Sequence, residues 1–203
     1  MTADDIDLGT DLTRAGPAEA RLVGDITADA FADDPFNLWL VGTRAGVRGI
    51  FLPLARHVYV PQGFCYHLGN DGACMWLLPG QHADFGFWAL KKLQFNTLFR
   101  GTRGAVRRIN HTVPAMEAAH PTFPHAYLFT IGVRPASQGK GLGRKLITPV
   151  LKACDRARLP AYLENSNPEN TAFYRSCGFE QSADAIHPEP GSPPLVPMTR
   201  RPR

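Results

Sequence analysis

The sequence predicts an α/β fold, and three features of its C-terminal half indicate it. AYLFTIGV, at 126–133, has the composition of a buried strand and ends at Arg134-Pro135. A glycine-rich turn and an amphipathic helix to about residue 158 follow. AYLEN, at 161–165, is a second short strand. A strand, a helix and another strand in this order predict a parallel pair.

The rest of the C-terminal half is predicted from its caps and prolines. A short helix should follow AYLEN, with Asn167 as its cap, Pro168 in its first turn and Gly178 just past its end. Phe179 should begin a further strand. LVPMT, near the C-terminus, is expected to be a final edge strand.

The N-terminal half is expected to begin with a flexible acidic tail, 1–14, with residues 15–203 forming one domain. A first helix should begin at Gly16-Pro17 and stop before Pro35, because a residue before proline disfavours helix. A second helix is expected over about 45–56.

A hairpin should come next. VYV (58–60) and FCYHL (64–68) are rich in strand-forming residues, and Asn70–Gly72 supplies a turn before ACMWLL. Residues 82–119 are mostly helical by pattern, and three large apolar residues there are expected in the core: Phe87, Trp88 and Leu93.

Composition excludes several classes of protein. The 203 residues, 44% hydrophobic and 20% charged, are typical of a soluble globular domain. No run of eighteen apolar residues predicts a membrane span, and the acidic N-terminus lacks the apolar core of a signal peptide, so we expect a cytoplasmic location without membrane contact. The four cysteines show no CxxC spacing, and His120 and His125 lie on a proline-rich loop, so no metal site is expected.

Charge is distributed unevenly along the chain. Nine of the eighteen acidic residues fall within the first 34 positions, and the remainder carries 20 basic and 9 acidic residues, a net charge of +11. Such a field attracts anions. Because the basic residues are not interleaved with aromatic residues, a compact polyphosphate is expected rather than nucleic acid.

The stretch QGKGLGRKL, 138–146, is the candidate anion site. A P-loop beginning at Gly139 and a dinucleotide fingerprint passing through Gly141 both require glycine where Arg144 stands. A turn with converging N–H groups at a helix N-terminus remains, and it can hold a phosphate. A tight turn without a ligand stays open as the alternative.

Two motifs resemble those of the GNAT N-acetyltransferases. IGVRPASQGKGLGRKL resembles the acyl-CoA-binding motif, a Gln or Arg followed by two spaced glycines, and NPENTAFYRSCGF is similar to the second signature of the family. The closer resemblance is to the puromycin N-acetyltransferase-like branch, through AFADDPF, WLLPG, HP…PHAYL and PAYLENS. It covers the chain from about residue 17 to the end. It implies a GNAT-like fold with a central twisted mixed sheet flanked by helices.

The resemblance implies direct transfer of an acetyl group from acetyl-CoA to an amine in a ternary complex. It places the pantetheine arm along the backbone of Ile131 and Val133, which could also be plain core residues, and gives the Val133 N–H to the thioester carbonyl. Asn170, alternatively a helix cap, and Phe173 would flank the cofactor. The pyrophosphate cradle would comprise Gln138, Gly139, Lys140, Gly141, Leu142, Gly143 and Arg144.

The resemblance also implies catalytic roles. Tyr174 matches a tyrosine that protonates the leaving thiolate, and a tyrosine is protonated at neutral pH as an acid must be. Glu164, at the end of AYLEN, would act as base or orient a water, although exposed charges also lie at strand ends. Four residues after the first helix are candidates for binding a cationic, partly apolar amine: Asp33, Asp34, Phe36 and Trp39. Helix termination and core filling are the alternative roles of these four.

The leading hypothesis is therefore an N-acetyltransferase for a small antibiotic-like or metabolite-like amine, working as a monomer or homodimer. A protein or peptide acetyltransferase and a non-catalytic acyl-CoA sensor are the alternatives. Tyr174 and Glu164 favour catalysis, because a sensor requires neither.

Overall fold

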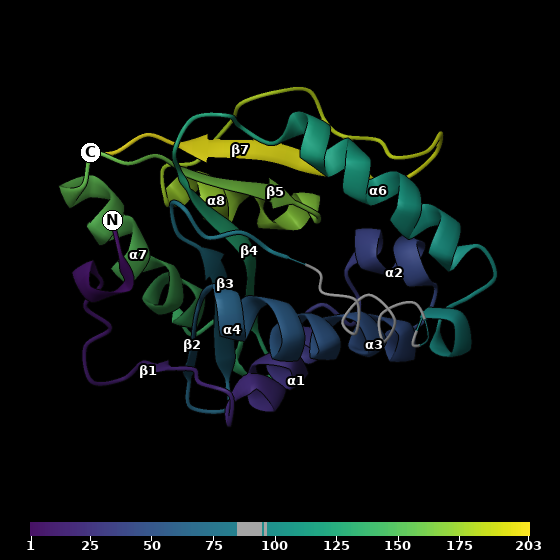
Figure 1. Ribbon diagram of the computed structural model, residues 1–203, viewed down its shortest axis with the longest axis horizontal. Coiled ribbons are helices and arrows are strands. Elements are labelled where there is room, and N and C mark those ends of the chain that lie inside the picture. The colour runs from purple at the N-terminus through teal and green to yellow at the C-terminus, as the bar shows by residue number, and fades with distance from the viewer. Residues whose placement is uncertain (85–94, 96) are drawn as a thin grey trace.

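The computed structural model describes residues 1–84, 95 and 97–203, and its described strands form one twisted sheet (Figure 1). The sheet order is β1-β2-β3-β4-β5-β7-β6, and every neighbouring pair is antiparallel except β4 and β5, which are parallel. The strands are β1 Thr13–Arg14, β2 Phe64–Leu68, β3 Gly72–Leu77, β4 Ala126–Val133, β5 Ala161–Asn165, β6 Glu180–Gln181 and β7 Val196–Arg200. This confirms the predicted mixed sheet and its parallel pair.

Helices cover both faces of this sheet. The α-helices with described bounds are α1 Ala20–Ala30, α2 Pro35–Val41, α3 Arg44–Leu54, α4 Val60–Gln62, α6 Ala105–Ala119, α7 Leu142–Arg156 and α8 Thr171–Ser176. Shorter turns of helix are η1 Ala3–Asp5, η2 Ala55–Tyr59, η3 Pro135–Ser137 and η4 Pro168–Asn170. No helix among the described residues has the length and apolar character needed to cross a bilayer.

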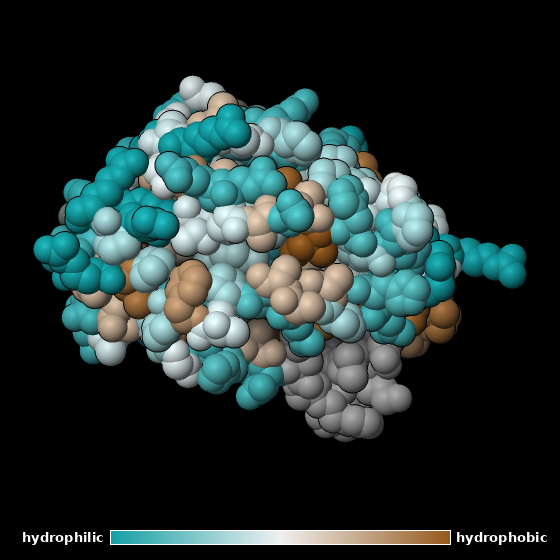
Figure 2. Space-filling view, turned by 90° about the horizontal axis from the view of Figure 1, so that it is seen from above, coloured by the Kyte–Doolittle hydropathy of each residue, from teal (hydrophilic) through white to brown (hydrophobic). Residues whose placement is uncertain are grey.

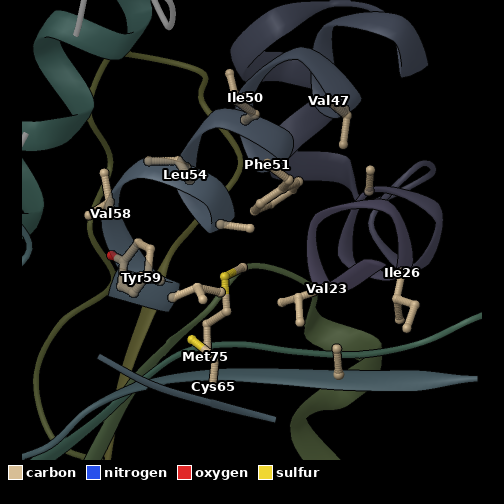
Figure 3. Close-up of a cluster of buried hydrophobic side chains, with 14 of the residues drawn as sticks. Val23, Ile26, Val47, Ile50, Phe51, Leu54, Val58, Tyr59, Cys65 and Met75 are labelled. Atoms are coloured by element: carbon tan, nitrogen blue, oxygen red, sulfur yellow. The ribbon is translucent and has the colours of Figure 1, made fainter. Parts of the chain in front are cut away.

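Side chains of the central strands β2, β3, β4 and β5 point to two apolar cores, one on each face of the sheet. Cys65 and Met75 point to the face covered by α1, α3 and η2, which we call the α1 face, and Figure 3 shows them beneath Val23 and Phe51. Neighbouring strand residues such as Trp76 point to the opposite face, covered by α7 and α8, which we call the α7 face. Burial of a sheet on both faces is typical of α/β proteins.

Several elements differ from the sequence prediction. Helix α1 begins at Ala20 rather than at residue 16, and Val58–Val60 continues a helix instead of forming a strand. Strand β7 is not an edge strand, because β6 pairs with its outer side. Phe87, Trp88 and Leu93 lie outside the described residues, and α6 confirms the helical prediction over its own span.

The first fourteen residues lie against the sheet rather than forming a loose tail. Thr13 and Arg14 pair with β2, and Ile6 and Leu12 are buried in the core of the α7 face. Asp11 forms an ion pair with Lys145 of α7 at 3.1 Å. Apolar residues between the acidic ones therefore hold this segment in place. The face shown in Figure 2 is largely hydrophilic, with apolar residues in small groups.

Candidate active site

Strands β4 and β5 part after a short parallel contact, and a cavity opens where they separate. Their register contains two pairs, Ala126 with Ala161 and Tyr127 with Tyr162, although both strands continue further. A cavity of about 800 Å³ lies there. Tyr127 belongs to the core of the α1 face, whereas Leu163 and Tyr174 belong to that of the α7 face, and all three line the cavity. This central cavity therefore passes through the plane of the sheet.

A bulge in β4 determines to which face of the sheet the side chains after Leu128 point. Trp76 pairs with Leu128 but Met75 pairs with Thr130, so Phe129 has no partner in β3. The extra residue shifts the alternation, and Ile131 and Val133 consequently pack against the core of the α7 face. The two residues expected along a pantetheine arm thus lie on the side of α7.

The glycine turn before α7 has the geometry of an anion site. Gly139 and Gly141 both have φ of +76°, and a Cβ at either position would meet no atom of the described residues within 4 Å. The amide groups of 139–143 donate no hydrogen bond within the described residues. Free N–H groups at the start of a fifteen-residue helix, facing open space, fit a pyrophosphate.

The polar side chains of this turn are held by nearby backbone groups. Gln138 donates to the Val133 carbonyl at 3.0 Å, and Lys140 donates to the Ala136 carbonyl at 3.3 Å. The Arg144 guanidinium donates to the carbonyl and hydroxyl oxygens of Ser176, at 3.0 and 2.6 Å. Each side chain is thus placed at the rim of the turn, while the Leu142 side chain is half-buried.

Helix α8 brings two of the predicted residues to this region. A Cβ on Gly143 would lie 3.3 Å from the Phe173 ring, so glycine allows α7 and α8 to approach closely. Tyr174 is buried and lines the central cavity. Burial raises the pKa of Tyr174 above its ordinary value, and Cys74 and Asp34 raise it further by smaller amounts. The hydroxyl therefore keeps its proton.

Asn170 is exposed and makes no capping hydrogen bond. The cap belongs to Asn167, whose side chain accepts from the Glu169 amide at 3.0 Å. The Asn170 side chain is therefore available to a ligand, and its alternative role as a helix cap is not observed.

Glu164 lies at the bottom of a cluster of aromatic rings. Its side chain is only 3% exposed, and its Oε2 accepts a hydrogen bond from the Tyr127 hydroxyl at 2.8 Å. Its Oε1 is buried and has no hydrogen-bond partner among the described residues, and His120 Nδ1 lies 3.6 Å from it. Burial, and then the Glu164 charge, raise the pKa of Tyr127 well above its ordinary value, so the tyrosine stays the donor.

Two histidines belong to this cluster, and the sequence analysis assigned neither a role. His120 and His125 line the central cavity, with their Nε2 atoms 3.0 Å apart. Burial lowers the pKa of His125, which favours its neutral form. Nothing in the segment HPTFPH itself indicates that Glu164 is near, so the sequence does not predict this cluster. Within the described part of the chain, no group of three His, Cys, Asp or Glu side chains has a metal-binding arrangement.

The four residues expected to hold the amine are divided by the structure. Phe36 lines the central cavity. Asp34 is buried and caps α2 by accepting from the Asn37 amide at 2.8 Å, while its Oδ2 accepts from the Ser166 hydroxyl at 2.7 Å. Asp33 forms an exposed ion pair with Arg44, and Trp39 packs against Phe36 beneath Arg108. Neither Asp33 nor Trp39 is among the described residues that line the cavity.

The walls of the central cavity on the side of α1, α3 and α6 are mainly apolar. They include Phe31, Phe36, Phe51, Ile109, Met116 and Phe129. The rings of Tyr59 and Phe129 stack at 4.0 Å between centroids. An apolar chamber that ends at one buried carboxylate and two imidazoles suits an amine with a hydrophobic body.

Comparisons with known proteins agree with this geometry. Residues 87–179 match the model of the acetyltransferase (GNAT) family. An uncharacterized N-acetyltransferase of Schizosaccharomyces pombe is 30% identical over 171 residues, covering 74% of this chain and 66% of that protein. The 5-NmdU N-acetyltransferase of Pseudomonas phage PaMx11 is 33% identical over 63 residues, 31% of this chain and 45% of that enzyme. The chain therefore spans less than two thirds of the length of both relatives.

Solved structures share the fold along nearly the whole chain. A Corynebacterium glutamicum protein described as histone acetyltransferase HPA2 and related acetyltransferase is 21% identical, with a TM-score of 0.66, covering 95% of this chain and 96% of its own. The PaiA N-acetyltransferase of Thermoplasma acidophilum, solved with coenzyme A, is 9% identical with a TM-score of 0.54, covering 94% and 97%. At these identities the likeness shows the fold alone. None of these comparisons confirms the puromycin branch.

Proposed function

We propose that the chain, which matches the model of the GNAT acetyltransferase family over residues 87–179, transfers the acetyl group of acetyl-CoA directly to a primary amine of a small molecule. The observation that carries the proposal is the central cavity, which joins the Tyr174 hydroxyl and the Glu164 cluster through the gap between β4 and β5.

Acetyl-CoA fits the residues on the side of α7. Bound acetyl-CoA supplies the thioester carbon that the amine attacks, and the new N–C bond replaces the C–S bond. The free amides of 139–143 would hold its pyrophosphate, and the backbone of Ile131 and Val133 would bind its pantetheine arm. The Val133 N–H would stabilise the carbonyl oxygen as it gains negative charge. The Asn170 side chain and the Phe173 ring would flank the same arm.

Tyr174 is proposed as the general acid. Its buried, protonated hydroxyl lines the cavity and would donate its hydrogen to the leaving sulfur. The proton that the nitrogen loses as the amide forms restores the tyrosine. Glu164 is proposed to act on the acceptor side, where an alkyl ammonium must lose a proton before it can attack.

The acceptor is proposed to be an amine with an apolar body, since aromatic and aliphatic side chains form most of the chamber beyond Glu164. Phe36 would contact this body directly, and Asp34 would act indirectly by fixing α2 to Ser166. The sequence resemblance makes puromycin the first compound to test.

The proposal is tested by a panel of amines with detection of released CoA. The panel contains puromycin, hydrophobic alkyl and aryl amines, polar amines and short peptides with free N-termini. We expect acetyl-CoA-dependent turnover with the hydrophobic small amines. Turnover confined to peptides would replace the small-molecule substrate with a peptide. Saturable acetyl-CoA binding without turnover of any amine would favour a sensor.

A further inference from the structure

A chain of polar contacts runs from the loop before β4 to the buried carboxylate. The Phe123 carbonyl oxygen lies 2.7 Å from His125 Nδ1, and His125 Nε2 lies 3.0 Å from His120 Nε2. The other nitrogen of His120, Nδ1, lies 3.6 Å from Glu164 Oε1. That oxygen is buried and has no hydrogen-bond partner in the part of the chain that the structure describes.

These contacts fix where the protons lie when both histidines are neutral. A carbonyl oxygen can only accept, so His125 Nδ1 carries a hydrogen and its Nε2 is the acceptor. His120 Nε2 must then donate to it, which leaves His120 Nδ1 without a hydrogen. The opposite arrangement requires a doubly protonated His125, and burial lowers the pKa of that residue.

The basic atom of the pair therefore faces Glu164. A proton added at His120 Nδ1 would form an ion pair with the carboxylate, while the bonds to His125 and Phe123 remain unchanged. Two edge-on ring contacts hold the imidazole in place, with Tyr127 at 4.8 Å and Tyr162 at 5.1 Å between centroids. The site is built to accept one proton at one nitrogen.

We propose that His120 Nδ1 is the atom that takes the proton from the acceptor's ammonium group, with Glu164 and His125 as positioning residues. This inference rests on the proposed function. R–NH₃⁺ gives one proton to His120, and the neutral nitrogen then forms the N–C bond as the C–S bond breaks. The nitrogen's second proton goes to the sulfur by way of Tyr174, and His120 releases its own proton to solvent.

Their exposed fractions favour the His120 side chain over that of Glu164 as the group that contacts the substrate. The His120 side chain is 34% exposed, whereas that of Glu164 is 3% exposed and already bonded to Tyr127. The titratable groups around His120 are Glu164 and Tyr162 from β5, Tyr127 from β4, His125 from the loop and Glu117 from the last turn of α6. Among these groups, the Glu164 carboxylate is the one that lies against His120 Nδ1.

The first test is His120→Gln, with His111→Gln in the preceding helix α6 as the matched control. A glutamine amide can still donate to His125 but has no basic nitrogen. His111 lies beside Glu189 and is not among the described residues that line the cavity. We expect kcat/KM for an alkyl amine to fall at pH 7 by about 10²–10⁴-fold in His120→Gln, and to stay unchanged in the control.

The pH dependence separates a base from a structural residue. Without its base the enzyme depends on amine that is already neutral, so the deficit should shrink by about tenfold per pH unit between pH 7 and 9. With an aryl amine, which is neutral at pH 7, His120→Gln should lose less than about threefold. A loss that is equal at every pH and for both amines would overturn the proposal, as would full activity.

The second test needs no turnover. Nitrogen-15 NMR of the histidine rings in the wild-type protein should show hydrogen on His125 Nδ1 and His120 Nε2 above neutral pH. Titration should then add the next proton to His120 Nδ1. A resting state with hydrogen on His120 Nδ1 would overturn the inference even if His120→Gln fails to fold. Failure of the proposed function would appear differently, as an absence of acetyl transfer in the wild-type protein.

Discussion

Tyr127 donates its hydroxyl hydrogen to Glu164 Oε2 across 2.8 Å, and this bond joins β4 to β5 where their parallel pairing ends. The two strands cannot share backbone hydrogen bonds beyond that point without closing the central cavity. A buried side-chain bond therefore stabilises the gap on which the proposed chemistry depends.

Replacing Tyr127 with phenylalanine should destabilise the protein. The change leaves Glu164 Oε2 buried without a donor, which costs about 1–3 kcal/mol in the free energy of unfolding. The matched control is Tyr162→Phe in the next strand, because that hydroxyl is buried without a hydrogen-bond partner among the described residues. Its removal should change stability by less than about 0.5 kcal/mol. Equal losses in urea denaturation would contradict the assigned bond.

Gly141→Ala should abolish stabilisation by acetyl-CoA. Its φ of +76° disfavours any side chain, and the Cβ would project into the space where the pyrophosphate is proposed to lie. Gly191→Ala is the control, since Gly191 has φ of +78° and equally open surroundings. Both variants should lose about 1–2 kcal/mol of stability.

The difference between these two variants should appear only with ligand present. Acetyl-CoA at 100 times its Kd should raise the stability of the wild-type protein and of Gly191→Ala by about 2.7 kcal/mol. Gly141→Ala should show no rise in melting temperature. A rise equal to that of the control would remove the turn from the cofactor site.

Tyr174→Phe should lower kcat by about 10²-fold or more while acetyl-CoA affinity stays nearly constant. The tyrosine's pKa is raised by burial, so ionisation of its hydroxyl should not reduce the wild-type rate at any pH below 10. Steady-state kinetics between pH 6 and 10, with binding measured by calorimetry, provide the check. Unchanged turnover would exclude Tyr174 as the acid.

The neighbouring aspartates before α2 should behave differently. Asp34→Ala removes the helix cap and the bond to Ser166, and should cost about 1–3 kcal/mol. Asp33→Ala breaks an exposed ion pair with Arg44 and should cost less than about 0.5 kcal/mol. Thermal denaturation of both variants distinguishes them. Amine KM values altered by Asp33→Ala alone would restore that residue to the acceptor site.

The four cysteines predict a loss of stability at alkaline pH. All are buried, and burial raises the pKa of Cys65 and of Cys154 to about 12. The folded pKa exceeds the unfolded one, so the thiols' contribution is fully present below about pH 8.5 and is lost as the pH rises toward 12. Urea midpoints should therefore fall between pH 8 and 10. The measurement is the urea midpoint of the wild-type protein at several pH values between 8 and 10. A midpoint that does not change with pH in the wild-type protein would contradict the prediction.

Local patterns predicted the strands at 126–133 and 161–165 with their observed bounds, because each is an apolar run between strong breakers. The hairpin turn at Asn70 was predicted for the same reason. The prediction for Val58–Val60 was wrong because its β-branched residues continue a helix whose burial outweighs their strand preference.

The site was predictable only where its residues are close in sequence. The glycine turn and Tyr174 lie within recognisable motifs, so their neighbourhood could be inferred. His120 meets Glu164 across 44 positions, through a contact created by the parting of β4 and β5. The shift produced by Phe129 was also hidden, because a bulge leaves no trace in the composition of a strand.

The gap between β4 and β5 makes the central cavity accessible from both faces of the sheet. Under the proposed function, acetyl-CoA would enter from the α7 face and the hydrophobic amine from the α1 face, and the two would meet only at their reacting ends. Neither molecule would have to leave before the other entered. Substitutions that reshape the acceptor side of the cavity would then leave the proposed acetyl-CoA side unchanged.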